Sequence, residues 1–384
     1  MRVGQAVLAV TLALVVVAAA GYALVPRDQL AVVEPGGFGV EAGVVGEYSL
    51  GEHTVVVEGE QVRVESPGGT VWASSPGTAF LSAAHGQVEW EEERGYFWPD
   101  VSHGEVWDDQ QLTGATVDEG LVELTGRLRD GDRWEGEGVD ADGGQPGTPP
   151  LETEFTVQFT ERPGGGVVAE VEVVGDVDVA MDSPRRPDVI RWTGSRAGDA
   201  GVHGFGEQFD DFDLSGRLVP IVIREQGVGR GEQPLTFLAD VTNGGAGGTR
   251  AMTYATWPSY VTGDLQGVRL DPDAAASYAF AIGDTRTPDL VGLDVWASEM
   301  RVELTRGDTP AELIETQHTG VERPRLADWT QDGAIVGIQG GTEKVRTVVD
   351  DLERAGTEIS GVWLQDWTGR RTTEPGSAGR VGGS

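Results

Sequence analysis

Short runs of alternating apolar and polar residues dominate the chain from Gly51 to about Val179. Four of them are HTVVVEGEQVRVES (53–66), LVELTGRLRD (121–130), ETEFTVQFTER (152–162) and GVVAEVEVVGDVDV (166–179). A period of two residues is typical of strands with one buried face and one solvent-exposed face. Turn-forming residues separate the runs. The pattern predicts an antiparallel β-sandwich. We expect the sandwich to resume in residues 251–263 and 277–283.

A different pattern follows Leu326. Residues 334–341 (AIVGIQGG) and 359–367 (ISGVWLQDW) are compact apolar runs, and between them TEKVRTVVDDLERA carries its valines and Leu352 on one helical face, with Gly356 as a stop signal. This order predicts a β-α-β unit with parallel strands. Two strands cannot cover both faces of a parallel sheet. We therefore expect the apolar faces of this unit to be exposed.

The N-terminus predicts export. Arg2 precedes an uncharged run from Ala6 to Val25, which is long enough as a helix to cross a bilayer of about 30 Å. Residues 1–28 are therefore interpreted as a signal peptide or a transmembrane anchor. We expect a single-pass protein whose C-terminal part lies outside the cell, or a secreted protein if the small residues at 18–20 are a cleavage site.

Composition excludes several classes of function. The formal net charge is −35 and Lys344 is the only lysine, so nucleic acid is not expected as a partner. The absence of cysteine excludes disulfides, thiol nucleophiles and thiolate metal sites. The five histidines are scattered without metal-ligand spacing, and GVGRG (227–231) is interpreted as a β-turn because neither a strand before it nor a helix after it is predicted. We expect neither metal nor cofactor.

Polar residues follow both strands of the predicted β-α-β unit. Gln339 ends the first, and Gln365, Asp366 and Trp367 end the second. In β/α barrels the active site lies at the carboxyl ends of the strands, and amide, carboxylate and indole groups suit a sugar. The alternative interpretation places Trp363 and Trp367 in the core, with the glutamines only ending the strands.

Four motifs, in this order, resemble one enzyme family. They are GFGEQFDDFDLSGR, REQGVGRG, GIQGGTE and GVWLQDWTGRR. Over about Ala200 to Arg371 the chain resembles the α-glycosidases of glycoside hydrolase family 31, and specifically their sulfoquinovosidase branch. The resemblance implies a mainly β fold, in which an N-terminal β-sandwich (galactose mutarotase-like) precedes a (β/α)8 TIM barrel. The predicted domains are 29–325 for the sandwich and 326–384 for the truncated start of the barrel.

The resemblance also suggests a role for His203 to Gly231. This segment is expected to be a sandwich loop that reaches the barrel mouth, anchored by its phenylalanines, with Glu207 and Gln208 holding its turn. A structural role is favoured over sugar contact for Glu207. The pair Asp210 and Asp211 is interpreted as solvated charge.

The same resemblance implies a substrate. In the sulfoquinovosidase branch, glutamines that match Gln339 and Gln365 contact the sugar, whereas ordinary family members have an aspartate at the second position. A neutral amide avoids repulsion of an anionic, sulfonated sugar. An arginine shortly after QDW holds the sulfonate, for which Arg380 is the best match and Arg370 and Arg371 are alternatives.

We expect this chain to have no catalytic activity. A retaining α-glycosidase uses two carboxyl groups about 5 to 5.5 Å apart, and the family takes both aspartates from later barrel strands. The chain is thus interpreted as the truncated, inactive front part of a retaining hydrolase of α-sulfoquinovosides. One alternative is a fragment of a plain α-glucosidase or α-xylosidase that acts on α-glucosides. The other is a non-catalytic, membrane-anchored carbohydrate-binding module. The oligomeric state stays open.

Overall fold

The computed structural model describes residues 28–93, 96–131, 152–174, 176–178, 183–243, 246–271, 280–321 and 323–364. Across these ranges, the helices are all too short or too polar to cross a membrane. The hydrophobic segment predicted to direct export lies outside the described residues. The predicted domain boundaries at 28 and 325 stay predictions.

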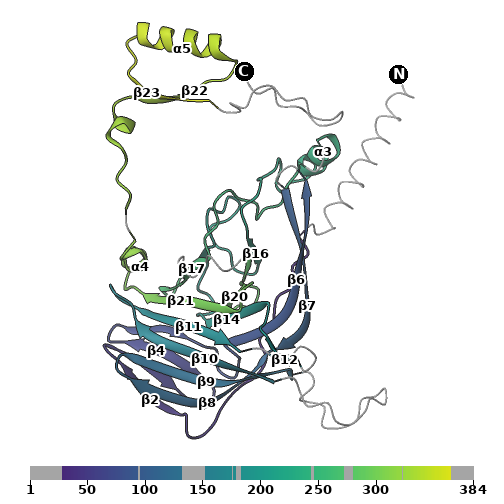
Figure 1. Ribbon diagram of the computed structural model, residues 1–384, viewed down its shortest axis with the longest axis vertical. Helices are drawn as coiled ribbons and strands as arrows, with labels where there is room; N and C mark the ends of the chain where they lie inside the picture. Colours follow the sequence, from purple (N-terminus) through teal and green to yellow (C-terminus); the bar gives the residue numbers. More distant parts are fainter. Residues whose placement is uncertain are drawn as a thin grey trace, which may run out of the picture.

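Most strands of the described chain belong to a β-sandwich built from two large sheets and a smaller one (Figure 1). In spatial order, the nine-stranded sheet contains β1 (Phe38–Val40), β8 (Asp109–Asp118), β9 (Leu121–Arg129), β10 (Glu152–Glu161), β11 (Val167–Val173), β21 (Glu299–Arg306), β18 (Gln266–Leu270), β17 (Ser259–Thr262) and β15 (Val202–Gly204). The six-stranded sheet contains β16 (Leu218–Ile221), β19 (Ala281–Asp284), β20 (Leu290–Val295), β14 (Val189–Ser195), β6 (Leu81–Glu93) and β7 (Tyr96–Trp107). The four-stranded sheet contains β2 (Gly46–Leu50), β3 (His53–Val57), β4 (Val62–Ser66) and β5 (Gly69–Ala73), and β12 (Asp176–Asp178) pairs with β13 (Ser183–Arg185).

Strands β9 and β10 show how the alternating sequence becomes a sheet. They pair antiparallel with Leu124 opposite Val157, and the apolar residue at every second position is buried. Gly126 makes room within this register, since a Cβ there would lie 2.5 Å from the ring of Phe155. Most buried apolar residues of the three sheets form one continuous core, and two smaller clusters involve the six-stranded sheet. The predicted fold class, a mainly β chain that starts with a sandwich, is confirmed.

Two helices inside the sandwich region were not predicted. Helix α3 (Leu235–Thr242) follows the GVGRG segment, so the expectation that no helix follows it is wrong. Helix α4 (Pro310–His318) begins with Thr309, whose side chain accepts a hydrogen bond from the Glu312 amide, and has proline in its first turn. Both helices are short and carry weak apolar stripes, which explains why periodicity did not reveal them.

Buried Arg162 fixes the carboxyl end of α4 to the sandwich. Its guanidinium donates hydrogen bonds to the carbonyl groups of Thr316 (2.7 Å), Gln317 (3.1 Å) and Thr319 (2.9 Å). It also pairs with Glu303 of β21 at 3.0 Å. Carbonyl groups at a helix end lack partners within the helix, and a cation there is favoured by the helix dipole. Arg162 therefore holds the last turn of α4 in place.

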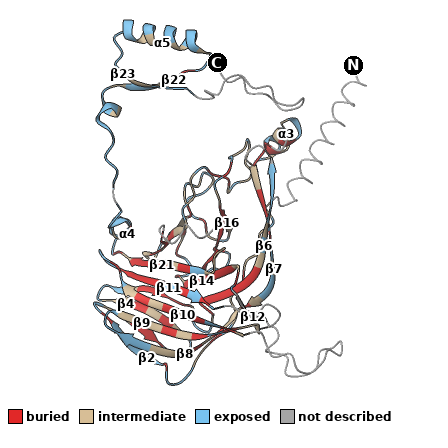
Figure 2. Cartoon of the chain, in the orientation of Figure 1, coloured by how far each residue is buried: buried red, intermediate tan, exposed pale blue. Residues whose placement is uncertain are grey.

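The predicted β-α-β unit is present. Strand β22 (Ala334–Gly337) and strand β23 (Ile359–Trp363) pair in parallel, with α5 (Thr342–Arg354) between them in sequence, and the 3-10 helix η2 (Asp328–Gln331) precedes them. Figure 1 shows α5 on one side of the two strands, with the unit standing apart from the sandwich. Figure 2 shows that most of the unit is exposed. The expected exposure of its apolar residues is confirmed, because Ile335, Val362 and Trp363 are all exposed.

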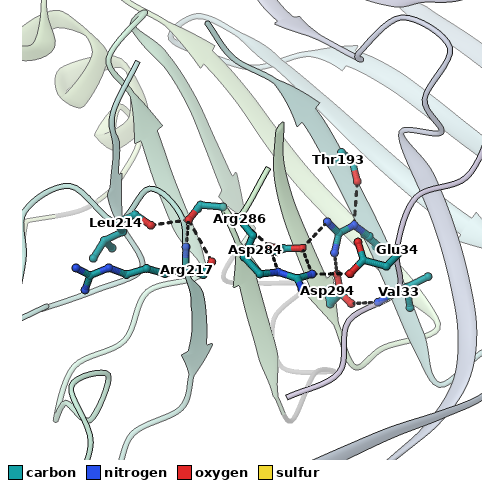
Figure 3. Close-up of polar contacts among 10 residues, drawn as sticks. Val33, Glu34, Thr193, Leu214, Arg217, Asp284, Arg286 and Asp294 are labelled. Carbon is teal, nitrogen blue, oxygen red and sulfur yellow. Dashed lines mark hydrogen bonds and ion pairs between the residues drawn. The ribbon is translucent and has the colours of Figure 1, made fainter. Parts of the chain in front are cut away.

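A buried charge network joins the start of the described chain to the six-stranded sheet (Figure 3). Arg191, on β14, donates hydrogen bonds to Asp294 (2.7 Å) and Asp284 (3.0 Å). The second oxygen of Asp294 accepts the backbone amide of Val33 at 2.7 Å. Although burial acts in the opposite direction, Arg286 and Arg191 hold the pKa of Asp284 below its usual value. Each carboxylate therefore has a cationic partner.

The network predicts an unusual pH dependence of the free energy of unfolding. Burial raises the pKa of Asp294 to about 6, above the value of about 3.9 in unfolded chains. Since the folded state binds this proton more tightly, Asp294 contributes stability that is fully present below about pH 4 and is lost as the pH rises through about 6. We expect the free energy of unfolding of the wild type, relative to Asp294→Asn, to fall by roughly 3 kcal/mol over this range. Urea denaturation of both proteins at several pH values tests this, and a difference independent of pH would contradict it.

Candidate functional site

Gln339 lies where the sequence predicted it, at the carboxyl end of β22. The parallel strands pair Gly337 with Trp363, and the Ile338 amide donates to the Trp363 carbonyl at 3.0 Å. Both strands thus end at the same edge, where Gln339 and Leu364 are exposed. The remaining predicted site residues, Gln365, Asp366, Trp367 and Arg380 with the alternatives Arg370 and Arg371, lie outside the described residues.

Trp363 is not a core residue. Its side chain is 66% exposed at the end of β23. The alternative interpretation, in which Trp363 fills the core of the unit, is therefore wrong. The physical reason is that α5 covers only one side of the two strands, and in the described chain the other side meets only the short helix η2 (Figure 1).

The loop after β15 has one aromatic anchor. Phe205 is fully buried, packs 5.7 Å from the ring of Tyr260 and donates its amide to the Ser259 carbonyl at 2.7 Å. Phe209 and Phe212 are 47% and 80% exposed, so the expectation that all of these phenylalanines anchor the loop is wrong. Phe212 stacks on the ring of His203, and the Arg230 guanidinium lies 4.9 Å from the centre of the Phe209 ring.

Gln208 stabilises the turn through its side chain, whereas Glu207 does so through its backbone. The Gln208 side-chain amide donates to the Phe205 carbonyl at 3.2 Å, which confirms that it holds the turn. Glu207 contributes only through its backbone amide, which donates to the Ala255 carbonyl at 2.8 Å. Among the described residues its exposed carboxylate has no hydrogen bond or ion pair. This carboxylate is therefore available to a ligand. Sugar contact was the less favoured of the two roles predicted for Glu207.

The other carboxylates of the loop are structural. Asp210 and Asp211 each bond the guanidinium of Arg217 at 2.7 Å. The interpretation as solvated charge is wrong for Asp210, which is largely buried, whereas Asp211 is exposed as predicted. Asp213 accepts the Ser215 hydroxyl at 2.7 Å and the backbone amides of Val202 and Ser215. The Ser215 hydroxyl is the main cause of the lowered pKa of Asp213. These bonds fix the loop shape that presents Glu207.

A cavity of about 790 Å³ lies between this loop, β17 and α4. Its walls include Glu207, Phe212, Trp257, Leu265, Ile314 and His318. Trp257 is 54% exposed, so its indole offers a surface for the C–H face of a sugar in the same cavity as Glu207. The rest of the wall is mainly apolar. In the described part of the chain, His, Asp and Glu side chains do not gather in any group that could hold a metal ion.

Comparison with known proteins supports the sequence resemblance. The chain is 34% identical over 177 residues to the sulfoquinovosidase of Escherichia coli (strain K12), a match that covers 46% of this chain and 25% of that enzyme. It is 32% identical over 182 residues to the sulfoquinovosidase of Agrobacterium fabrum, covering 47% and 26%. No family model matches the chain. The predicted resemblance to family 31 sulfoquinovosidases is confirmed.

The fold is also similar to a solved structure. A family 31 sulfoquinovosidase from E. rectale, in complex with an aza-sugar inhibitor, superimposes with a TM-score of 0.61 at 23% sequence identity. The superposition covers 83% of this chain and 42% of that one. The chain thus matches about a quarter of the length of the two curated relatives and under half of the solved structure.

Proposed function

We propose that this chain carries part of the sugar site of a glycoside hydrolase that acts on α-sulfoquinovosides. The observation that carries the proposal is the shared edge of β22 and β23, where an exposed Gln339 stands beside the strand that leads to Gln365. Similarity to two sulfoquinovosidases supports the choice of substrate class.

Each proposed site residue has a chemical role. Gln339 and Gln365 hydrogen-bond sugar hydroxyls without adding a negative charge near the sulfonate. Asp366 and Trp367 supply an acceptor and an aromatic surface, and the planar guanidinium of Arg380 binds the sulfonate through two oxygens. From the sandwich loop, Glu207 adds a carboxylate with no competing partner among the described residues.

Binding without turnover is the expected behaviour of the 384-residue chain. Calorimetry with sulfoquinovose, together with a chromogenic α-sulfoquinovoside assay, tests this. Hydrolysis would refute the expectation that the catalytic pair is lacking. Binding of glucose but not of sulfoquinovose would favour the plain α-glucosidase fragment. Equal binding of unrelated sugars would favour a general carbohydrate-binding module.

A charge introduced at position 365 should weaken binding of the anionic sugar. Gln365→Glu keeps the size of the side chain and adds one negative charge, so repulsion of the sulfonate should lower the affinity for sulfoquinovose at least about tenfold. The matched control is Gln331→Glu, which adds the same charge at an exposed position of η2. Calorimetry should show little change for the control. Equal losses in both variants would show that net charge, and not position 365, sets the affinity.

A further inference from the structure

The first described residues are fixed tightly to the sandwich. The buried Arg224 guanidinium donates hydrogen bonds to both carboxylate oxygens of Asp28, at 2.7 and 2.8 Å. The Gln29 amide donates to the Pro99 carbonyl at 3.0 Å, and the Gln29 carbonyl accepts the Val101 amide at 2.8 Å. Residues 28 and 29 therefore lie along β7 as a fixed part of the fold.

Only a short segment separates this fixed point from the predicted membrane anchor. The uncharged run ends at Val25, and Pro26 and Arg27 precede Asp28. Three residue steps span at most about 10 Å. When the anchor is retained, Asp28 therefore lies within about 10 Å of the membrane, and the end of the sandwich around Asp28 faces the bilayer.

Three large side chains near Asp28 are exposed. They are Trp90 (41%), Ile223 (60%) and Tyr254 (54%), called the anchor patch below. Trp90 pairs opposite Pro99, whose carbonyl accepts the Gln29 amide. Ile223 precedes Arg224 in the chain, and the Arg224 amide donates to the carbonyl of Thr253, the neighbour of Tyr254, at 3.0 Å. Tryptophan and tyrosine are enriched where proteins meet the membrane–water interface.

Helix α3 carries an apolar stripe on its outer side. The stripe consists of Leu235, Leu238 and Val241, all exposed. The buried residues of α3 are instead Thr236 and Asp240, and the Asp240 carboxylate accepts the Gly247 amide at 2.7 Å. A surface helix normally has the opposite arrangement, with its apolar stripe toward the core. Figure 1 shows α3 at the end of the molecule toward which β6 and β7 extend.

We propose that the anchor patch and the apolar stripe of α3 lie in the interface of a bilayer of zwitterionic lipid. The hydrophobic effect favours their insertion, and the predicted anchor holds this end of the sandwich at the membrane surface. Anionic lipid is disfavoured, because the formal net charge is −35 and Glu89 and Glu91 are exposed on β6. Both surfaces differ from the residues that line the cavity beside α4. The inference therefore rests on the predicted anchor and not on the proposed sugar site.

Spin labels on the full chain in phosphatidylcholine vesicles test this membrane contact. The chain has no cysteine, so Ile223→Cys and Leu238→Cys each give one label position, and Val117→Cys on β8 gives an exposed apolar control. We expect oxygen, which concentrates in the bilayer, to relax the first two labels more than a water-soluble nickel chelate does, and the opposite at 117. Adding Leu238→Asp to Ile223→Cys should lower the ratio of inserted to water-exposed label at least about tenfold, because one leucine loses its burial. Adding Val117→Asp should leave that ratio unchanged.

The results that would overturn the inference are distinct. Labels at 223 and 238 that are as accessible to nickel as the label at 117 would place this end of the sandwich in water. A chain that does not float with the vesicles would refute the predicted anchor. Labels shielded from both oxygen and nickel would show that protein, and not lipid, covers the two surfaces. Stronger insertion into vesicles that contain phosphatidylglycerol would contradict the choice of zwitterionic lipid. None of these measurements uses a sugar, so failure of the proposed function would leave their outcome unaffected.

Discussion

Replacing Asp294 with alanine is expected to lower the free energy of unfolding by about 3–5 kcal/mol near neutral pH. The substitution removes the acceptor of both the Arg191 guanidinium and the Val33 amide. Asp294 is fully buried and the Arg191 side chain is only 3% exposed, so water cannot replace the lost partner. Asp284 remains as the only carboxylate bonded to Arg191. Urea denaturation at constant pH measures the loss.

Two control variants test whether the burial of Asp294 and Arg191 causes this loss of stability. Asp294→Asn keeps the size of the side chain and one carbonyl oxygen for the Val33 amide, and should cost clearly less than alanine. Arg186→Ala removes ion pairs with Glu172 and Glu299, in which all three side chains are well exposed, and should cost at most about 1 kcal/mol. A loss for Asp294→Ala no larger than that of Arg186→Ala would contradict the proposed role of the network.

Gly206→Ala is expected to destabilise the protein by more than about 3 kcal/mol and to displace the loop that carries Glu207. Gly206 has a φ of 100°, and an added Cβ would lie 2.4 Å from the Ala255 carbonyl oxygen and 2.5 Å from the Thr256 Cα. These are backbone atoms, which cannot move aside as a flexible side chain would. Either residues 255–257 or the loop that carries Glu207 must shift.

Gly216→Ala provides the matched comparison. Gly216 also has a positive φ, of 81°, but an added Cβ there would have no atom within 4 Å. It should therefore cost only the conformational strain, about 1 kcal/mol. Thermal and urea denaturation of both variants compare the two costs. Similar losses would show that backbone conformation alone, and not close packing on residues 255–257, requires glycine at 206.

Local pattern predicted the regular parts of the fold. Strands β9 and β10 alternate along their length, β11 alternates from Ala169 onward, and α5 has both a clear apolar face and a glycine stop, so each was located from sequence. Helices α3 and α4 were missed because both are short and have weak apolar stripes, and α4 is also held by distant partners. The Arg162 contacts to α4 join residues about 150 positions apart, and no local window contains that information.

The candidate site could be predicted only where a local pattern marks it, and not where contacts formed on folding decide the role of a residue. Gln339 follows a recognisable strand, so its position at the strand end could be predicted. The roles of the loop carboxylates depend on which of them finds an arginine or a hydroxyl. Asp210, Asp211 and Asp213 have such partners, whereas Glu207 has none among the described residues. Adjacent acidic residues look alike in a sequence, and only the folded loop separates the structural ones from the available one.

The hydrogen bonds from Arg162 to the last turn of α4 determine where the chain can begin to move relative to the sandwich. Because three carbonyl groups at this helix end are bonded to a side chain rooted in the sandwich, the chain leaves the sandwich from a stationary pivot. The β-α-β unit can therefore move relative to the sandwich only beyond Thr319, and a force on the unit reaches β21 through Arg162 and Glu303 as well as through the backbone of α4.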